Sequence, residues 1–218
     1  METLSKLFGS QTRVKLMRFF LFNPDKIYSS KETANRAHSL LRETEKELRI
    51  FEKISFVRRR VIIETEIITR RNKKPLVRRR KIAGWMLDKL FPYLLPLKNL
   101  IINTTLVDHR EMIRRLARAG SLKLVIAAGV FIQEEESRLD MLIVGDHLKK
   151  AVISRTLKTL ESEIGKELRY VILETSEFKY RASICDKLIR DVMDYPHQKL
   201  LDKLEIDDKI EVPKHYQF

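Results

Sequence analysis

The sequence predicts two domains, an N-terminal α+β domain followed by an α/β domain. In the first half, three segments with helical periodicity precede a basic β-hairpin pattern, whereas helical and strand patterns alternate in the second half. Charge divides in the same way. Residues 1–103 hold 24 Lys and Arg against 10 Asp and Glu, and residues 104–218 hold 20 of each. The whole formal excess of +14 therefore lies in the first half.

Two helices are predicted before residue 40. Apolar residues at the spacing of one helix face predict the first helix: Val14, Met17, Phe20 and Leu21. It is expected to end at Asn23-Pro24-Asp25, because these residues break helical periodicity. Ser29 and Glu32 form a capping-box pattern that opens a second short helix. Its inner face is expected to carry Ala34 and Ala37.

A third helix is predicted after His38-Ser39, with Leu41, Leu48 and Phe51 inward. Three short helices with a tight turn before the third form a helix-turn-helix pattern. The N-terminal part of this helix is expected to reach base edges through Ser39, Arg42, Glu43 and Lys46. Deep insertion of the whole helix into a phosphate-lined groove is disfavoured by Glu43, Glu45 and Glu47.

A basic hairpin, or wing, is predicted next. Residues 57–69 and 76–82 are rich in β-branched residues, and residues 70–75 form the connection. Eleven cations between Arg58 and Lys81 face only Glu64 and Glu66. Lys and Arg also protect sheet edges from aggregation, but edge protection does not need three consecutive Arg on both strands. Clustered cations attract phosphate backbones, so we expect this region to bind double-stranded DNA. The contacts are expected from Ser39, Arg42, Lys46, Arg49, Arg58, Arg60, Arg70, Arg71, Lys73, Lys74, Arg78 and Arg80.

Residues 1–86 resemble the winged helix-turn-helix domains of bacterial and archaeal transcriptional regulators. The resemblance is carried by residues 28–34 (YSSKETA) and by residues 48–53 (LRIFEK), which precede the wing. It implies that the third helix reads the major groove while the wing holds the flanking backbone.

Residues 87–103 are predicted as a packed apolar connector, with Leu94, Leu97, Leu100 and Ile101 at helical spacing. The connector either joins the domains or contacts a second subunit, or it serves only the core of its own chain. A homodimer is expected because one winged helix has a modest footprint.

Residues 104–218 are predicted as an α/β domain. Its expected helices cover 106–119, 151–164 and 186–204, and its strands cover 123–132, 139–144 and 168–173. This half resembles the minimal nucleotidyltransferase fold, whose signature is a Gly-Ser pair followed by Asp-x-Asp on the next strand. A later run, Glu177-Phe178-Lys179-Tyr180-Arg181 leading into Cys185, resembles regulator-linked members of the same group. For that run we expect core packing by Phe178, Tyr180 and Ile184.

The nucleotidyltransferase signature is incomplete. Gly129 and Asp140 are kept, but Val130 stands in the place of Ser and Leu142 in the place of the second Asp. One carboxylate cannot neutralise two divalent ions and a triphosphate. We therefore expect a pseudoenzyme with no catalytic residues, in which Asp140 is solvated or caps a turn. The alternative is an active nucleotidyltransferase whose basic half holds a nucleic-acid or protein substrate.

Several classes of protein are not indicated. The first residues lack a secretory signal pattern and no membrane span is found, so a cytoplasmic protein without a membrane partner is expected. Cys185 is the single cysteine and the five histidines are scattered, so neither a metal site nor a cofactor is predicted. An RNA-binding or toxin-antitoxin component is a further alternative. The hairpin offers few aromatic residues for stacking single-stranded bases, which disfavours single-stranded RNA.

Overall fold

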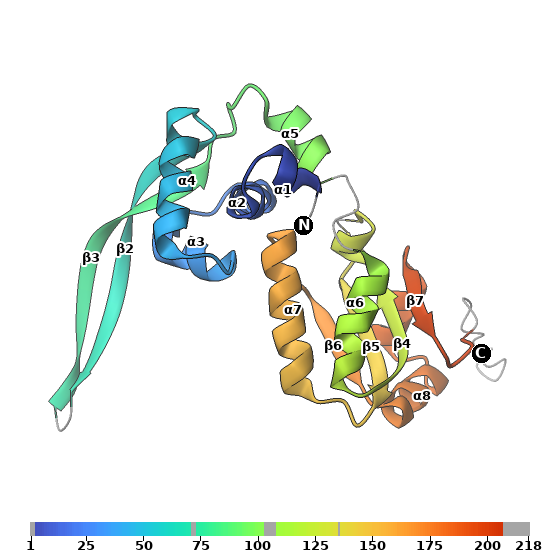
Figure 1. Ribbon diagram of the computed structural model, residues 1–218. Helices are drawn as coiled ribbons and strands as arrows, with labels where there is room; N and C mark the ends of the chain where they lie inside the picture. Colours follow the sequence, from blue (N-terminus) through green and yellow to red (C-terminus); the bar gives the residue numbers. More distant parts are fainter. Residues whose placement is uncertain (1–2, 71–72, 103–107, 135, 207–218) are drawn as a thin grey trace, which may run out of the picture. The chain divides into compact units, whose positions relative to one another are not determined.

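The fold is mixed α+β, with helices and two β-sheets (Figure 1). The computed structural model describes residues 3–70, 73–102, 108–134 and 136–206. The chain divides into two compact units. The first unit comprises Met1–Thr104 and Glu161–Lys166, and the second comprises Thr105–Leu160 and Glu167–Phe218.

The predicted helices of the first half are present in the first unit. After a short helix α1 (Thr3–Leu7), the three expected helices follow as α2 (Gln11–Phe22), α3 (Ser30–Arg36) and α4 (Leu41–Lys53). Helix α2 is capped by Ser10. Its last residue is Phe22 and its C-cap is Asn23, where the sequence predicts the end of the helix. At α3 the hydroxyl of Ser29 accepts a hydrogen bond from the Glu32 backbone N–H at 3.1 Å, which confirms the Ser29 half of the predicted capping box. The Glu32 carboxylate instead lies 3.7 Å from Arg36 Nε.

The inner faces of these helices form one apolar core. All four apolar residues predicted inward on α2 are buried, as are Ala34 and Ala37, and Leu48 and Phe51 are fully buried. Leu41 was expected inward as well, but 45% of its surface is exposed, so this prediction is wrong. Leu41 is the first residue of α4, and the buried stripe begins one turn later at Thr44.

The predicted hairpin is formed by β2 (Val57–Arg70) and β3 (Lys73–Leu87), paired antiparallel from Val57 opposite Leu87 to Arg70 opposite Lys73. Figure 1 shows the two strands running out beyond the helices of their unit. The second strand is longer than expected at both ends, so that Lys73, Lys74 and Pro75 belong to a strand and not to the connection. At its base β3 also pairs with β1 (Tyr28–Ser29), and pairing on both sides keeps this end of β3 extended.

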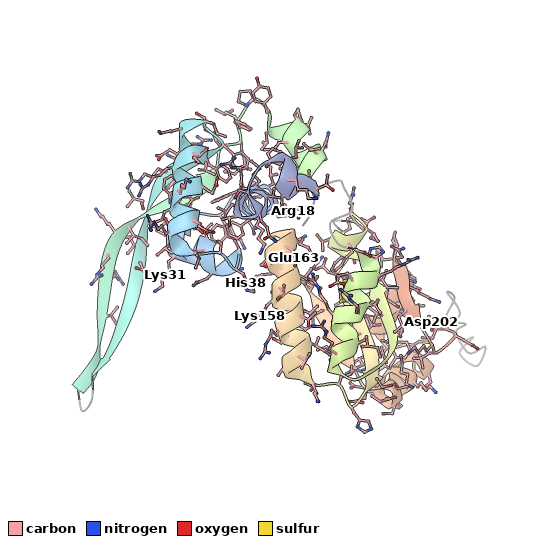
Figure 2. The ribbon with its side chains drawn as sticks, in the orientation of Figure 1. Arg18, Lys31, His38, Lys158, Glu163 and Asp202 are labelled. Atoms are coloured by element: carbon pink, nitrogen blue, oxygen red, sulfur yellow. The ribbon has the colours of Figure 1, made fainter. Side chains whose placement is uncertain are left out.

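The connector packs against the core of the first unit. Helix α5 (Leu94–Ile101) presents the fully buried Ile101, and Leu94 and Leu97 pack partly buried against the same cluster. Packing was expected for Leu100 too, but it is 43% exposed and lies at the edge of the apolar stripe. A buried arginine of α2, Arg18, forms a hydrogen bond with the end of α5. Arg18 donates to the carbonyl oxygens of Ile101 (3.3 Å) and of Glu163 (3.0 Å), both in the same unit (Figure 2).

The second unit is built on a four-stranded mixed sheet in the order β6-β5-β4-β7. Strand β5 is parallel to β6, and β4 is antiparallel to both β5 and β7. The strands are β4 (Ser121–Ala127), β5 (Met141–Asp146), β6 (Tyr170–Leu173) and β7 (Gln198–Asp202). The helices are α6 (His109–Leu116), α7 (Lys150–Ile164), α8 (Thr175–Ser183) and α9 (Lys187–Met193), with 3-10 turns η1 (Ala117–Ala119) and η2 (Gly129–Phe131).

Three predictions in this half need correction. The strand expected over 123–132 ends at Ala127, because Gly129 has a positive φ of 52° and turns the chain into η2. The helix expected over 186–204 ends at Met193, and β7 follows, since Pro196 interrupts helical hydrogen bonding. Helix α8 was not predicted. Of the residues expected to pack its region, Phe178 is buried, whereas Tyr180 and Ile184 are 66% and 55% exposed.

The start of the helix expected over 106–119 falls partly outside the described residues, and α6 begins after its N-cap Asp108. In the part of the chain that the structure describes, every helix is too short or too polar to cross a membrane.

Candidate nucleic-acid interface

Helix α4 carries a row of cations on its outer face. Arg42, Lys46, Arg49 and Lys53 are all exposed. Their spacing of four, three and four residues places them along one face of the helix, opposite the buried Leu48 and Phe51. We call these four residues the α4 basic row. It contains the three α4 cations expected from the sequence and adds Lys53.

Two acids of α4 are turned toward α2 and away from this row. Glu47 is almost fully buried and accepts hydrogen bonds from Arg13, from Nε at 2.8 Å and from Nη2 at 3.3 Å. Glu43 accepts from the Thr12 hydroxyl at 3.2 Å. From the sequence, both acids were expected to disfavour deep insertion of the helix into a phosphate-lined groove, and Glu43 was also expected near base edges. In the structure their carboxylates are engaged with α2, while Glu45 and Glu52 remain beside the row.

The start of α4 combines a hydrogen bond between two hydroxyl groups with exposed apolar side chains. The Ser39 hydroxyl lies 2.7 Å from that of Thr44, so it orders the first turn of the helix. Leu40 and Leu41 are 69% and 45% exposed at the same end. A ligand approaching this end therefore meets two leucines next to Arg42, with the half-buried Ser39 behind them.

The two faces of the hairpin differ in charge. Because directly opposed residues share a face in an antiparallel pair, the register defines both. On one face Arg60 lies opposite Gly84, and Arg80 lies opposite Glu64. Arg58 at the base of this face is half-buried and pairs with Asp88 at 2.9 Å. The hairpin cations Arg58, Arg60 and Arg80, all expected to contact DNA, thus share the face that also carries Glu64.

The opposite face combines cations with exposed apolar residues and no paired acid in its described register. Arg59, Arg79 and Lys81 lie opposite Trp85, Thr65 and Ile63, respectively, and all three are exposed. Val61, Ile63 and Val77 on this face are 70%, 64% and 55% exposed. We call these six residues the basic hairpin face. Its three cations belong to the predicted wing but were not among the expected DNA contacts. Side chains alternate between the two faces of a strand, so the sequence could have placed Arg59 on the face opposite to Arg58 and Arg60.

The basic hairpin face continues from the core of the first unit. Val57, Trp85 and Leu87 stand on the same side of the hairpin at its base, and all three are buried beneath the helices. The Arg59 guanidinium lies 6.0 Å from the centre of the Trp85 ring. This cation–π interaction holds the guanidinium close to the base of the hairpin. A shallow hollow of about 580 Å³ crosses this part of the hairpin. It is lined by Arg59, Arg60, Val61, Lys81, Ile82 and Ala83.

For five other cations expected to bind DNA, the structure does not describe the side chain. Arg71 lies wholly outside the described residues. The strands include Arg70, Lys73, Lys74 and Arg78, but their side chains also lie outside the described part of the molecule.

In the second unit, Gly129 and Asp140 are brought into contact. Gly129 turns the chain after β4, and a Cβ atom added to it would lie 2.2 Å from Asp140 Oδ1. Asp140 precedes β5 and is fully buried. It was expected to be solvated or to cap a turn. It is not solvated, and it does cap η2, because its Oδ1 accepts from the Val130 N–H at 3.0 Å.

The fully buried Asp140 forms an ion pair with Arg169, whose side chain is 46% exposed. Its Oδ2 accepts from Arg169 Nε (3.0 Å) and from the Arg169 backbone N–H (2.8 Å), while Oδ1 accepts from Nη2 (3.1 Å). Burial raises the pKa of the Asp140 carboxyl. The hydrogen bonds from Arg169 and Val130 outweigh this effect, so that the pKa lies below its ordinary value. The pKa of Arg169 is raised by the same pair.

An apolar residue, Leu142, stands at the position where the nucleotidyltransferase signature has its second Asp. Leu142 is fully buried in the core on one face of the sheet, together with Leu124, Val144 and Phe178. Across the described ranges, no group of three or more His, Cys, Asp or Glu side chains is arranged to hold a metal ion. The cationic partner of Asp140 in this unit is the guanidinium of Arg169.

The chain matches no protein-family model, and no match is found among curated proteins or solved structures.

Proposed function

We propose that this protein is a sequence-specific regulator of transcription that binds double-stranded DNA. Helix α4 enters the major groove, and the hairpin contacts the DNA beside it. The observation that carries the proposal is the α4 basic row: four exposed cations on one helix face, with Glu43 and Glu47 of the same helix drawn onto α2. Such a helix presents positive charge to a polyanion without bringing those two carboxylates into the groove.

The exposed leucines at the start of α4 support specific recognition. In the helix-turn-helix arrangement that residues 1–86 resemble, the N-terminal residues of the recognition helix meet base edges. Leu40 and Leu41 are placed there with Arg42, which offers apolar contact for a thymine methyl group and a guanidinium for guanine. Ser39, whose hydroxyl faces Thr44, orders this end and is not itself required to touch a base.

A salt titration tests the proposal. Binding to a labelled DNA duplex is measured between low and physiological salt for the protein and for Arg42→Ala/Lys46→Ala. The logarithm of affinity should fall less steeply with salt in the variant, by up to about two units of slope, at about 0.9 for each phosphate that is no longer neutralised. The matched control is Arg155→Ala/Lys158→Ala, which also removes one exposed Arg and one exposed Lys, from α7 (Figure 2). Equal slopes for all three proteins would reject α4 as the DNA-contacting helix.

We assign the second unit no catalytic role. The Asp140 carboxylate is occupied by Arg169 and Val130, and Leu142 contributes to the core where a second metal-binding carboxylate would stand. We propose that this unit serves as a pseudo-nucleotidyltransferase domain for dimerisation or sensing. Incorporation of labelled nucleotide that requires Mg²⁺ and disappears in Asp140→Asn, with the fold retained by circular dichroism, would overturn this assignment.

We further propose a homodimer. The connector exposes large apolar side chains, with Leu90 81%, Tyr93 68% and Leu95 68% accessible, and a second half-site would supply the specificity that one module lacks. Light scattering at micromolar protein should give twice the mass of the 218-residue chain. A monomer mass under these conditions would contradict the dimer.

A further inference from the structure

We propose that the basic hairpin face enters the major groove of duplex DNA and reads the C5-methyl groups of thymine through Val61, Ile63 and Val77. This inference rests on the proposed function and goes beyond it. A hairpin that only clamps the backbone requires cations and no apolar side chains, because phosphate contacts carry no sequence information. Here three β-branched side chains stand exposed among Arg59, Arg79 and Lys81 on one face.

The dimensions of the hairpin favour the major groove. From Val61 to its end at Arg70, β2 extends about 30 Å at ~3.3 Å per residue, close to one turn of B-DNA at about 34 Å. Two paired strands lie about 4.8 Å apart before their side chains are counted. The major groove, about 12 Å wide, admits such a ribbon, whereas the minor groove is only about 6 Å wide.

The apolar residues on this face point to a specific chemical feature of the groove. Among the four bases, thymine presents a methyl group in the major groove, and apolar side chains are its natural partners. Val61 and Ile63 are two positions apart on β2, and Val77 lies farther out on β3 on the same face. Lys81 lies directly opposite Ile63, so one cross-strand pair offers both an apolar contact and a cation.

Charge selects DNA over a second copy of the chain. Two hairpins packed through this face would bring Arg59, Arg79 and Lys81 of each copy against those of the other, and like charges placed together without water are destabilising. A polyanion satisfies the three cations and covers the apolar residues at once. An anionic lipid surface offers the same two features and is a separate outcome of the test below.

The experiment compares thymine with uracil in duplexes of otherwise identical sequence. The full chain is titrated into a labelled alternating dA·dT duplex of about 30 base pairs, roughly three turns, and into the same duplex with dU replacing every dT. The substitution removes major-groove methyl groups and leaves the phosphates and the minor-groove pattern unchanged. The uracil duplex should bind more weakly, by about fourfold for each thymine methyl group that the protein touches.

Two variants separate methyl recognition from charge. Val61→Ser/Ile63→Ser should weaken the preference for thymine by the share that the hairpin contributes and keep the salt slope. A preference for thymine that this variant retains in full would overturn the inference. Arg79→Ala/Lys81→Ala should lower the salt slope and keep the preference. Ile184→Ser, which changes a β-branched residue of the second unit with similar exposure, should alter neither. Circular dichroism checks the fold of each variant. Because Leu40 and Leu41 of α4 also offer contacts for thymine methyl groups, the preference lost in Val61→Ser/Ile63→Ser, and not the preference of the unmodified protein alone, reports on the hairpin.

The outcomes distinguish this inference from the proposed function. Equal binding of the two duplexes, with the α4 basic row still setting the salt slope, would reject methyl recognition and leave DNA binding intact. No binding to any duplex would reject both. Binding to anionic phosphatidylserine vesicles, abolished in Val61→Ser/Ile63→Ser while duplex binding is unchanged in that variant, would assign the basic hairpin face to lipid and overturn the inference.

Discussion

The carboxylate of Glu47 on α4 is held by the guanidinium of Arg13 on α2, with Arg13 Nε 2.8 Å from Glu47 Oε2. This ion pair fixes one helix against the other and also keeps a negative charge from facing a ligand on the outer side of α4. Arg13 strengthens the arrangement by donating through Nη1 to the Phe8 carbonyl at 3.1 Å.

Replacing Arg13 should therefore affect both stability and DNA binding. In Arg13→Met the nearly buried Glu47 loses its partner, and the free energy of unfolding should fall by about 2 kcal/mol. Duplex affinity should fall as well, because the released carboxylate is free to turn toward solvent near the α4 basic row. Urea unfolding and a duplex titration measure the two effects. Arg181→Met, which breaks the more exposed Arg181–Glu177 pair on α8, should cost less than about 1 kcal/mol and leave affinity unchanged. Similar costs for both variants would contradict the role given to Arg13.

The Asp140–Arg169 pair predicts how stability depends on pH. The folded-state pKa of Asp140 is below its ordinary value of 3.8, so the unfolded chain takes up the proton first as pH falls. The stabilisation is thus complete above the unfolded pKa and is lost as pH falls below about 4 toward the folded pKa. Asp140→Asn should lower stability at neutral pH by about 2 kcal/mol, from the loss of hydrogen bonds to a charged group, and weaken its decline with acid. A variant whose stability falls as steeply as that of the unmodified protein between about pH 5 and about pH 2 would rule out this pair as the cause.

Gly129 is predicted to be intolerant of any side chain. Gly129→Ala introduces a Cβ atom 2.2 Å from Asp140 Oδ1 and forces alanine to a φ of +52°. The free energy of unfolding should fall by more than about 2 kcal/mol, from the clash and the strained backbone together. Gly9→Ala isolates the backbone component, because Gly9 has a φ of +69° with no atom within 4 Å of the added Cβ. It should cost only about 1 kcal/mol. Equal losses would show that Asp140 does not constrain this turn.

The buried Arg18 gives a fourth prediction, for the core of the first unit. Arg18→Met keeps much of the length of the side chain but leaves the carbonyl oxygens of Ile101 and Glu163 without this donor. A loss of about 2–3 kcal/mol is expected in thermal or urea unfolding. Lys31→Met on α3 changes an exposed cation of the same unit and should be nearly neutral (Figure 2). A neutral Arg18→Met would contradict the contribution of these hydrogen bonds.

Local patterns in the sequence predicted local structure well. The cap at Ser29, the end of α2 at Asn23 and the buried residues Leu48 and Phe51 all depend on neighbours within a few turns, so periodicity and turn chemistry identify them. The two strands of the hairpin were also identified by their β-branched residues, although the extent of β3 at its base depends on pairing with β1, which comes from a distant segment.

Features that depend on tertiary contacts were not predictable from periodicity. The partner of Glu47 lies 34 residues away, and that of Asp140 lies 29 residues away. Strand β7 follows a helical pattern and is fixed by pairing with β4, which the sequence does not reveal. The basic hairpin face could have been derived, because β-strand alternation alone separates Arg59 from Arg58 and Arg60 once the strand is known.

The central claim, specific binding of duplex DNA, is tested most directly by selecting bound duplexes from a random DNA library at about physiological salt, where backbone attraction is partly screened. The proposed function predicts an enriched motif, arranged as an inverted repeat if the protein is a dimer, and loss of that enrichment in Arg42→Ala/Lys46→Ala. Binding without any enriched motif, or an enriched motif that this variant retains in full, would contradict recognition by α4.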